Sequence, residues 1–290
     1  MTEPTSKAAL VTGCSSGIGR ATAERLAGAG WTVYATARKV DSLSDLEAKG
    51  CRTLALDVTD EDSMAAGVRT VEEAEGAVGV LVNNAGYSQS GAIETLTAEQ
   101  IRRQYETNVF GLIRMSQLVL PGMRRQRFGK IVNVSSMGAN FTFPGGGLYH
   151  STKYAVEAIS EALRFEVKGF GVDVIVLQPG IIRTGFSDTA VSSIGEDSGE
   201  ADGDPYRRFN RAVAKATAEV YEGGPVARLG GGPETVAAAV EKAITAEKPK
   251  ARYRVTASAH LLTGQRALMS DGLWDRFLAT RFPRPGAKTD

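Results

Sequence analysis

Cysteine is scarce in this chain, and no stretch is long and apolar enough to predict a membrane span. Only two cysteines occur among 290 residues. Cys14 and Cys51 form neither a paired thiol motif nor a disulfide framework. The first residues carry no cationic segment followed by an apolar core, so no secretory signal is indicated. We therefore expect a cytoplasmic protein without a membrane span.

An excess of either charge is also missing. The 34 Lys and Arg residues nearly balance 33 Asp and Glu residues, for a net charge of +1. Such a balance gives no reason to expect a nucleic-acid partner. Only two histidines are present, His150 and His260. Neither has a ligand partner nearby in the sequence, so we predict structural roles for both and no metal site.

Up to Thr184, short β-branched runs alternate with helical patterns. We expect strands at 8–13, 31–38, 52–58, 78–86, 130–136 and 172–180, helices at 17–30, 61–74, 98–125 and 149–168, and a further strand at 251–255. Strands that are apolar along their whole length are typical of a parallel sheet covered on both faces. The prediction is an α/β fold of three α/β/α layers, with a doubly wound parallel sheet (Rossmann fold) in a single domain over residues 1–290.

The pattern weakens after Thr184. Residues 185–232 are rich in glycine, serine and acid, with one expected helix at 206–221, and are predicted to form a substrate lid. A C-terminal helical extension is expected over residues 258–290. Within it, an apolar face is formed by Leu273, Trp274, Phe277, Leu278 and Phe282. We expect this face to pack near the lid and to line the substrate pocket or a subunit interface; a membrane-surface anchor is the alternative.

A glycine cluster separates the first strand from the first helix. The stretch TGCSSGIG at 12–19 places Gly13, Gly17 and Gly19 in the connecting turn. A helix N-terminus presents free N–H groups and the positive end of its dipole, which attract phosphate, and glycine permits close approach. After the first strand of an α/β chain, this turn predicts a nucleotide-binding site.

The glycine spacing resembles the T-G-x-x-x-G-I-G signature of the short-chain dehydrogenase/reductase family. Five further motifs of that family follow in its order: Asp57-Val58, Asn83-Asn84-Ala85-Gly86, Asn108 in TNVFG, Ser136 thirteen residues before Tyr149 of the YHSTK segment, and Pro179-Gly180 with Thr184. The resemblance covers about residues 6–186. The remainder is similar to the branch that holds hydroxysteroid- and retinol-type dehydrogenases.

The resemblance implies a role for each matched position. Its catalytic set is Asn108, Ser136, Tyr149 and Lys153. The implied cofactor contacts are Gly13, Ser15, Ser16, Gly17, Ile18, Gly19, Asp57, Val58, Asn84, Ala85, Gly86, Tyr149, Lys153, Pro179, Gly180, Ile182 and Thr184. It further implies that Lys153 binds the nicotinamide ribose and that Asn108 holds a water of a proton relay. It also implies a homo-oligomer, dimer or tetramer, paired through helices 98–125 and 149–168.

Tyr149 and Lys153 lie four residues apart, on one face of the expected helix. Hydride transfer to a carbonyl leaves charge on oxygen, so Tyr149 is the candidate proton donor and Ser136 the candidate polariser. A phenol titrates near pH 10, and a cation about 4 Å away at an effective dielectric near 20 is worth roughly 4 kcal/mol, about three pKa units. We therefore expect Lys153 to lower the pKa of Tyr149.

The second strand ends in Ala37, Arg38 and Lys39. Proteins that select NAD usually place an acid here to bind the adenosine ribose hydroxyls. A guanidinium can instead grip a 2′-phosphate with its planar fork. Arg38 is therefore a further candidate cofactor contact, and the sequence predicts NADP(H) as the preferred cofactor, with NAD(H) possible.

These features predict an NADP(H)-dependent oxidoreductase that acts on a small apolar ketone or secondary alcohol of steroid, retinoid or lipid type. Two alternatives stay open. One is reduction of a 3-oxoacyl thioester, whose acidic carrier could dock on the basic cluster Arg124, Arg125, Arg127 and Lys130. The other is a catalytically idle nucleotide-sensing protein, which would have no chemical need for the complete catalytic set.

Overall fold

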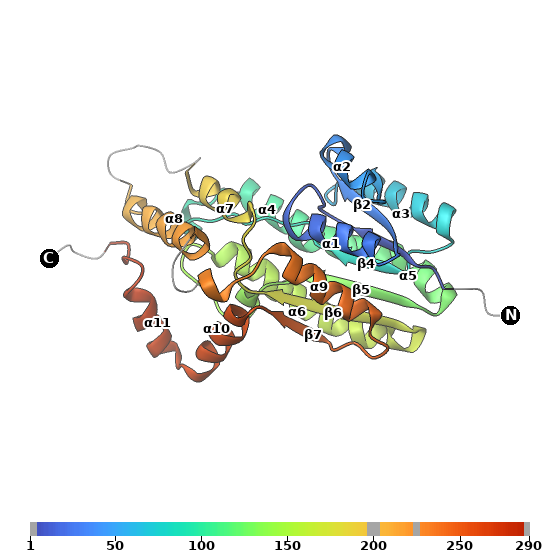
Figure 1. Cartoon of the computed structure of the whole chain (residues 1–290). Helices are drawn as coiled ribbons and strands as arrows, with labels where there is room; N and C mark the ends of the chain where they lie inside the picture. The colour runs from blue at the N-terminus through green and yellow to red at the C-terminus, as the bar shows by residue number, and fades with distance from the viewer. Residues whose placement is uncertain (1–4, 196–203, 223–226, 287–290) are drawn as a thin grey trace.

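A seven-stranded sheet forms the centre of the molecule (Figure 1). The computed structural model describes residues 5–195, 204–222 and 227–286. All neighbouring strands are parallel, in the order β3-β2-β1-β4-β5-β6-β7. The strands are β1 (Ala8–Val11), β2 (Thr32–Ala37), β3 (Arg52–Ala55), β4 (Val80–Asn83), β5 (Gly129–Val134), β6 (Val172–Pro179) and β7 (Arg252–Val255). The predicted doubly wound parallel sheet is confirmed.

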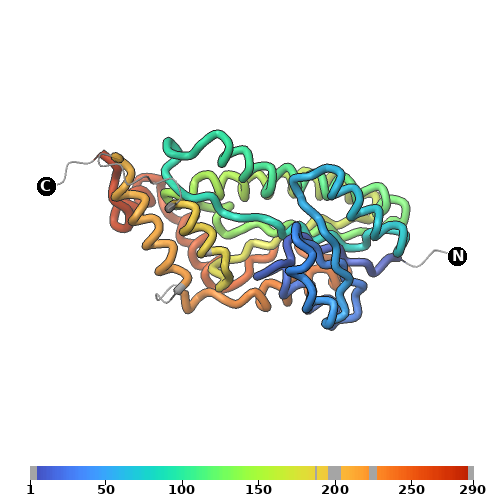
Figure 2. The backbone as a smooth tube through the Cα atoms, turned by 90° about the horizontal axis from the view of Figure 1, so that it is seen from above, coloured from blue at the N-terminus to red at the C-terminus, as the bar shows by residue number. Residues whose placement is uncertain are grey.

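Helices cover both faces of this sheet (Figures 1 and 2). In chain order they are α1 (Gly17–Gly28), α2 (Ser44–Glu47), α3 (Glu61–Glu75), α4 (Ala98–Tyr105), α5 (Gly111–Gln126), α6 (Gly147–Val167), α7 (Phe186–Gly195), α8 (Arg207–Glu222), α9 (Pro233–Thr245), α10 (Ala257–Leu268) and α11 (Asp271–Ala279). Helices α1 and α9 pack on one face, and α3, α5 and α6 pack on the other. The result is the three-layer arrangement expected from the sequence.

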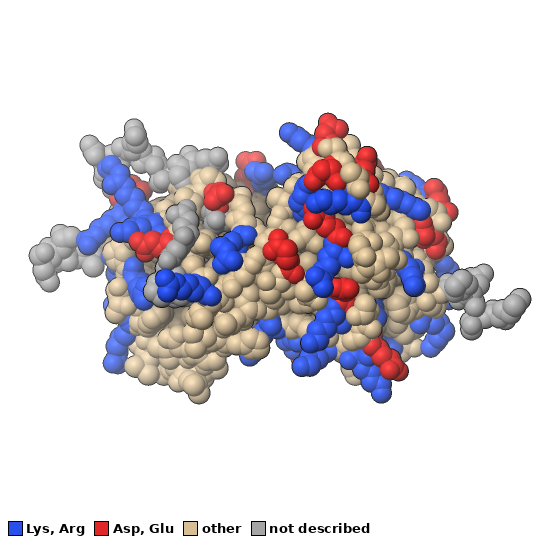
Figure 3. All heavy atoms as spheres, in the orientation of Figure 1, with Lys and Arg blue, Asp and Glu red and all other residues tan. Residues whose placement is uncertain are grey.

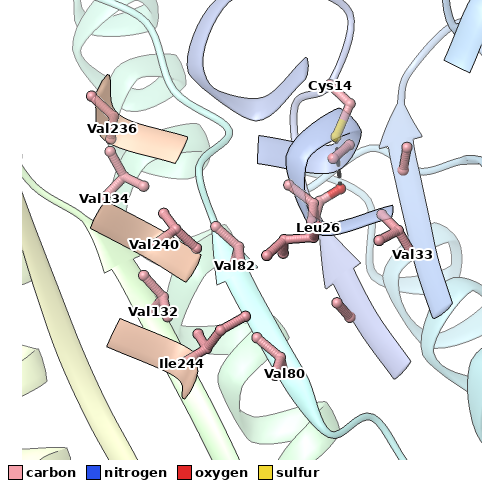
Figure 4. Close-up of a cluster of buried hydrophobic side chains, with 14 of the residues drawn as sticks. Cys14, Leu26, Val33, Val80, Val82, Val132, Val134, Val236, Val240 and Ile244 are labelled. Atoms are coloured by element: carbon pink, nitrogen blue, oxygen red, sulfur yellow. Dashed lines mark hydrogen bonds between the residues drawn. The ribbon is translucent and has the colours of Figure 1, made fainter. Parts of the chain in front are cut away.

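Each strand contributes to two hydrophobic cores, because successive side chains of a strand point to opposite faces. Ala9 and Val11 of β1 belong to the core under α1 and α9, whereas Ala8 and Leu10 belong to the core under α3 and α5. Figure 4 shows the first core, where side chains of β4 and β5 meet α9. Burial on both faces explains why the strands read as continuous apolar runs.

The predicted helix 98–125 is divided in the structure. Helix α4 passes into a π-helical turn at Glu106–Phe110, and α5 follows directly. A π turn shifts the hydrogen-bond pattern by one residue and is found mostly at functional sites. Asn108 lies at the centre of this turn. The distortion therefore falls on a residue of the predicted catalytic set.

The described part of the predicted lid holds two α-helices where the sequence predicted one. Besides α8, residues after Thr184 form α7, whose Ala190 and Ile194 are buried. Ala190 and Ile194 lie four residues apart on one helical face, but the surrounding glycine, serine and acidic residues obscured that pattern. Segments 196–203 and 223–226 of the predicted lid lie outside the described residues, as do 1–4 and 287–290.

Helices α7, α8, α10 and α11 gather beyond the carboxyl ends of the strands (Figure 1). Trp274 of α11 is buried, and its ring lies 5.9 Å from Phe141 and 5.8 Å from Phe143, measured between centroids. Phe282 packs against an apolar cluster that includes Ile194 of α7 and Phe209 of α8. The predicted contact between tail and lid is therefore present. No helix in the described ranges has the length and apolarity to cross a membrane.

Candidate active site

Two turns at the carboxyl ends of β1 and β4 are tied together by one threonine. The Thr12 hydroxyl accepts hydrogen bonds from the backbone N–H groups of Asn84 and Ala85, each at 3.0 Å. The Asn84 side-chain amide donates to the carbonyls of Thr12 at 2.9 Å and Gly13 at 3.1 Å. The glycine-rich turn and the NNAG turn thus form one rigid unit where the strand order reverses, the usual ligand site of such sheets.

Close contacts favour glycine at two positions of the first turn, and positive φ angles favour it at two. Gly13 has a φ of +72°, and a Cβ there would lie 2.9 Å from the Cα of Ala85. A Cβ at Gly19 would collide with the Gly13 carbonyl and the Asn84 amide. Gly17 has a φ of +60°, and a Cβ there would lie 3.4 Å from Thr184. The turn therefore has no room for side chains at Gly13 and Gly19, and Gly17 is favoured by its positive φ.

The N-terminus of α1 is open toward the turn. Ser15 and Ser16 are exposed, and the Ser16 hydroxyl does not cap the helix. Ile18 packs against the core under α1 and holds the helix in place. The first N–H groups of α1 are thus left without a side-chain cap, and this arrangement suits a phosphate.

Side chains expected at the adenosine end lie along the next strands. Arg38 follows β2, is exposed and forms no ion pair with any described residue. The Asp57 carboxylate accepts hydrogen bonds from the backbone N–H of Thr59 at 2.9 Å and from its hydroxyl at 2.8 Å. Val58 is buried, and Gly86 is exposed after the NNAG turn. Arg38 is the positive charge among them.

Residues after β6 close the other side of the site. The Gly180 N–H donates to the Val255 carbonyl at 3.0 Å, which fixes the turn after Pro179 against β7. Ile182 is buried and pairs with Gly231 in an isolated β-bridge. Thr184 faces Gly17, so this segment lies beside the phosphate turn.

The Asn108 side chain makes three hydrogen bonds within the protein. Its carbonyl oxygen accepts a hydrogen bond from the Tyr87 N–H at 3.1 Å. Its amide donates to the Tyr87 carbonyl at 2.9 Å and to the Thr152 hydroxyl at 3.1 Å. Asn108 therefore joins the loop after β4 to α6, beside Lys153. The relay water that the resemblance implies at Asn108 stays a prediction.

Ser136 and Tyr149 come together at the end of β5. The Ser136 hydroxyl accepts a hydrogen bond from the Gly138 N–H at 3.0 Å and so begins a short 3₁₀ turn. Tyr149 is the third residue of α6 and interacts with the Ser136 side chain. The predicted donor and polariser therefore share one site.

Burial raises the pKa of Tyr149 above its ordinary value. The phenol of Tyr221 on α8 raises this pKa further, whereas Ser136 lowers it in part. This result corrects the expectation that Lys153 lowers the pKa of Tyr149. The Lys153 ammonium lies 5.7 Å from the Tyr149 ring centroid and donates a hydrogen bond to the Val134 carbonyl at 2.8 Å. Desolvation of the phenol outweighs this more distant charge.

Burial also lowers the pKa of Lys153 to about 8, although Glu157 opposes the change. Removing an ammonium from water disfavours its charged form, and a single carboxylate does not compensate for that loss. Lys153 is therefore poised to lose its proton just above neutral pH.

Aromatic rings surround the reactive phenol. The Tyr149 ring lies 5.4 Å from Phe186 of α7 and 5.6 Å from His150, between centroids. His150 lies 6.3 Å from Phe143, again between centroids. Sequence patterns missed Phe186 and Tyr221, because α7 was not expected and α8 was assigned only to a lid. The available signal was Phe186, a large aromatic residue close to Thr184 of the family motif.

An apolar groove of about 400 Å³ begins beyond Phe143. Its walls come from the loop after β4, the loop before α6, α8 and the tail; they include Ala92, Ile93, Phe143, Phe209 and Leu278. Gly147, two residues before Tyr149, forms part of the lining. Figure 3 shows few charged side chains over α10 and α11, next to this region. The groove therefore suits an apolar chain.

The loop after β4 also holds the lid helices by hydrogen bonds. The Ser90 N–H donates to the Ser193 hydroxyl at 3.0 Å, and the Ala92 N–H donates to the Asn210 side chain at 3.2 Å. Gln89 donates to the Ser193 carbonyl at 3.2 Å. These contacts place α7 and α8 over the candidate site.

Known proteins resemble this chain in sequence. The family description "short chain dehydrogenase" matches residues 7–194. A 3-ketodihydrosphingosine reductase of Bacteroides thetaiotaomicron is 37% identical over 246 residues, which span 85% of this chain and 86% of that protein. An NADPH-dependent 3-dehydrocapnine reductase of Ornithobacterium rhinotracheale is 34% identical over 279 residues, 92% of this chain and 94% of that protein.

The fold has a similarly extensive match among solved structures. A short-chain dehydrogenase from Streptomyces avermitilis superposes with a TM-score of 0.76 at 34% sequence identity. The alignment covers 98% of this chain and 100% of that one. The likeness therefore includes the lid and tail as well as the sheet.

Proposed function

This chain belongs to the short-chain dehydrogenase family, and on that premise we propose that it reduces an apolar, lipid-like ketone with NADPH. The proposal rests above all on one observation: Ser136, Tyr149 and Lys153 meet at the carboxyl edge of the sheet, between an open phosphate turn and an apolar groove. The catalytic set is Asn108, Ser136, Tyr149 and Lys153, with Asn108 positioning α6.

The electrostatics of Tyr149 suit reduction. Its raised pKa keeps the phenol protonated at neutral pH, so a proton is available when charge develops on the substrate oxygen. The Ser136 hydroxyl polarises the carbonyl. The tyrosinate left after proton transfer lies near the Lys153 ammonium, which stabilises it. The bound nicotinamide cofactor supplies the hydride.

Arg38 supports NADPH as the preferred cofactor. Its guanidinium is exposed at the end of β2, where the adenosine ribose of a bound dinucleotide would lie. A 2′-phosphate would give it an anionic partner. The 3-dehydrocapnine reductase, which is 34% identical, is described as NADPH-dependent. NAD(H) lacks the 2′-phosphate and is expected to bind more weakly.

Two observations support a lipid-like substrate over a steroid or retinoid. The groove beyond Phe143 is bounded by separate elements, including α8 and the tail, as a long chain would require. The two curated relatives are named for 3-ketodihydrosphingosine and 3-dehydrocapnine, both oxidised at a 3-position. The hydroxysteroid- and retinol-like placement of the tail stays a sequence prediction.

The 3-oxoacyl thioester alternative is less well supported, because the basic cluster lies at the wrong edge of the sheet. Lys130 begins β5 and donates to the Ala246 carbonyl at 2.6 Å, whereas Tyr149 lies beyond the opposite end of that strand. Arg124 stacks over Phe170, and Arg127 donates to the Gly169 carbonyl at 3.2 Å. A carrier docked there would not face Tyr149.

We also propose a cytoplasmic homo-oligomer paired through α5 and α6. Phe110, Tyr154 and Phe165 are exposed by 50%, 45% and 89% on the elements that the family resemblance assigns to a subunit interface. A second copy would cover these side chains. Cys14 and Cys51 are free buried thiols, as expected in a reducing compartment.

A carbonyl panel tests the function. Consumption of NADPH and NADH is followed with alkyl ketones of increasing chain length, a steroid ketone, a retinoid aldehyde and a 3-oxoacyl thioester. Long-chain ketones with NADPH should give the highest kcat/KM. A higher value for the thioester or the steroid would overturn the substrate assignment, and no turnover of any carbonyl would overturn the enzymatic role.

A further inference from the structure

His150 is held in one tautomer by its surroundings. The backbone N–H of Phe143 donates a hydrogen bond to its Nδ1 at 3.3 Å. Nδ1 therefore carries the lone pair, and the proton of the neutral ring is on Nε2. Burial lowers the pKa of His150 to about 4, so the ring is neutral at physiological pH. The side chain is a fixed hydrogen-bond donor.

That donor has no partner among the described residues. The side chain is half-buried, and Nε2 is not one of the buried polar atoms that lack a partner, so Nε2 reaches open space. When a ligand acceptor replaces water at a half-buried N–H, the new hydrogen bond forms in partly desolvated surroundings, where hydrogen bonds are stronger than in water. The position is therefore suited to a ligand oxygen.

The open space adjoins the reaction centre. His150 Nε2 lies 2.9 Å from the point where a Cβ at Gly138 would sit, and the Ser136 hydroxyl oxygen lies 3.4 Å from the same point. A Cβ at Gly146 would lie 3.4 Å from Nε2. Two glycines thus leave room for the imidazole beside Ser136. The ring centroid also lies 5.6 Å from that of Tyr149 and 6.3 Å from that of Phe143, which lines the apolar groove.

We propose that His150 binds a hydrogen-bond acceptor on a carbon next to the reacting carbonyl of the substrate. The inference rests on the proposed function and makes it narrower: the preferred ketone carries a hydroxyl or similar acceptor beside the C=O group. Ser136 and Tyr149 serve the reacting oxygen, and the groove takes the chain. Nε2 lies between these two regions, where the substituent nearest the carbonyl would pass.

Three ketones of one chain length test this directly: a methyl ketone, and two hydroxyketones with the hydroxyl on either neighbouring carbon. The parent protein should prefer one hydroxyketone about tenfold in kcat/KM, the worth of one neutral hydrogen bond. His150→Phe keeps a ring but loses the donor, and should remove that preference while changing methyl ketone reduction less than twofold. His150→Gln keeps an N–H donor and should restore most of it.

Equal losses for all three ketones in His150→Phe would overturn the proposal in favour of a packing role. A parent protein that prefers the methyl ketone would also overturn it. The KM for NADPH is the internal control and should stay within twofold in both variants, because His150 is assigned to the substrate.

A measurement without turnover separates this proposal from the proposed function. The chain has two histidines, so ¹⁵N-histidine spectra compared with those of His260→Gln identify the His150 signals. They should show a neutral ring protonated on Nε2 at pH 7. Adding the hydroxyketone to protein saturated with NADP⁺ should shift the Nε2 signal, whereas the methyl ketone should not. A ring protonated on Nδ1, or equal responses to both ketones, would overturn the proposal even in a protein that reduces neither.

Discussion

The sheet with its turns and the helices beyond its carboxyl edge are held together in different ways. The sheet is bound by continuous ladders of backbone hydrogen bonds and by two large cores. Helices α7 and α8 are held by a small apolar cluster around Ile194 and Phe209 and by bonds such as that between Ala92 and Asn210. The reacting groups belong to the first region, whereas the apolar groove is shared: loops of the first region form one part of its lining, and α8 and the tail form the other.

The difference separates reaction chemistry from substrate choice. Tyr149, Ser136 and Lys153 occupy positions fixed by β5 and α6, so their geometry does not depend on the lid. The groove depends on α8 and the tail, which can change in sequence with little effect on the sheet. Changes at Tyr149, Ser136 and Lys153 should therefore affect all ketones alike, and changes in α8 and the tail should depend on the ketone.

Removal of the proton donor should have the largest effect. Tyr149→Phe should lower turnover at least about a hundredfold, the scale of general acid catalysis, and equally for short and long ketones. Tyr154→Phe is a matched control, since Tyr154 lies on the same helix but is 45% exposed, and it should stay within twofold of the parent. Steady-state kinetics with circular dichroism as a fold check would measure both. A loss below tenfold in Tyr149→Phe would contradict the assignment.

Substitutions at the end of β2 should have the second largest effect, which is a change in the preference for NADPH over NADH. The parent should prefer NADPH over NADH by roughly ten- to a hundredfold, or about 1.5–3 kcal/mol for a charge-assisted hydrogen bond. Combining Ala37→Asp with Arg38→Leu should reverse the order, because a carboxylate repels the 2′-phosphate and accepts hydrogen bonds from a ribose hydroxyl.

Lys39→Leu is the control for this change and should keep most of the preference. The ratio of long- to short-ketone kcat/KM should be the same in every one of these variants, since Arg38 lies in the sheet region. Equal use of both cofactors by the parent would show that Arg38 does not read the phosphate.

A substitution in the C-terminal tail tests the second region, the helices beyond the carboxyl edge of the sheet. Trp274→Ala removes a buried indole that contacts Phe141 and Phe143 near the groove. Phe143 lines the groove and would lose this support, so the KM for a long-chain ketone should rise about tenfold and that for a short ketone less than twofold. Leu273→Ala, at a neighbouring position that is 48% exposed, should change neither. Equal increases for both ketones, with the melting temperature unchanged, would count against a role of the tail in the pocket.

The smallest effect is a pH dependence in the sheet region. Because the pKa of Lys153 is lowered to about 8, its ammonium is present below that pH and is lost as the pH rises through it. The kcat/KM for reduction, which reports the free enzyme, should fall about twofold between pH 7 and 8 and further above. In Lys153→Arg the guanidinium stays charged, and the residual activity should lose this inflection. A profile that is flat to pH 9 in the parent would exclude Lys153 as the titrating group.

The sequence predicted the sheet well because its strands are buried on both faces and read as uninterrupted apolar runs. The catalytic set came from the resemblance to the family motifs and stays a prediction; helical spacing alone indicated only that Tyr149 and Lys153 lie on one helical face. The π turn at Asn108 was not predicted, since a shift of one hydrogen bond leaves the apolar periodicity nearly unchanged.

The expected direction of the Tyr149 pKa shift was wrong for a related reason. Spacing in sequence indicates that Lys153 is near, but it does not show that the phenol is buried or that the ammonium donates to Val134. His150 was assigned a structural role from the sequence, because the loop that brings Phe143 to its Nδ1 has no regular pattern. Burial and loop geometry depend on the packed chain.

The contact between Gly17 and Thr184 has a kinetic consequence. Gly17 is the first residue of α1, whose N-terminus would face the cofactor phosphates. Thr184 lies two residues before the start of α7. A dinucleotide seated in the turn would therefore press on the first residues of the segment that carries Phe186 to Tyr149. We expect an ordered sequence of events in which the dinucleotide enters first and leaves last, so that its release limits turnover at saturating ketone.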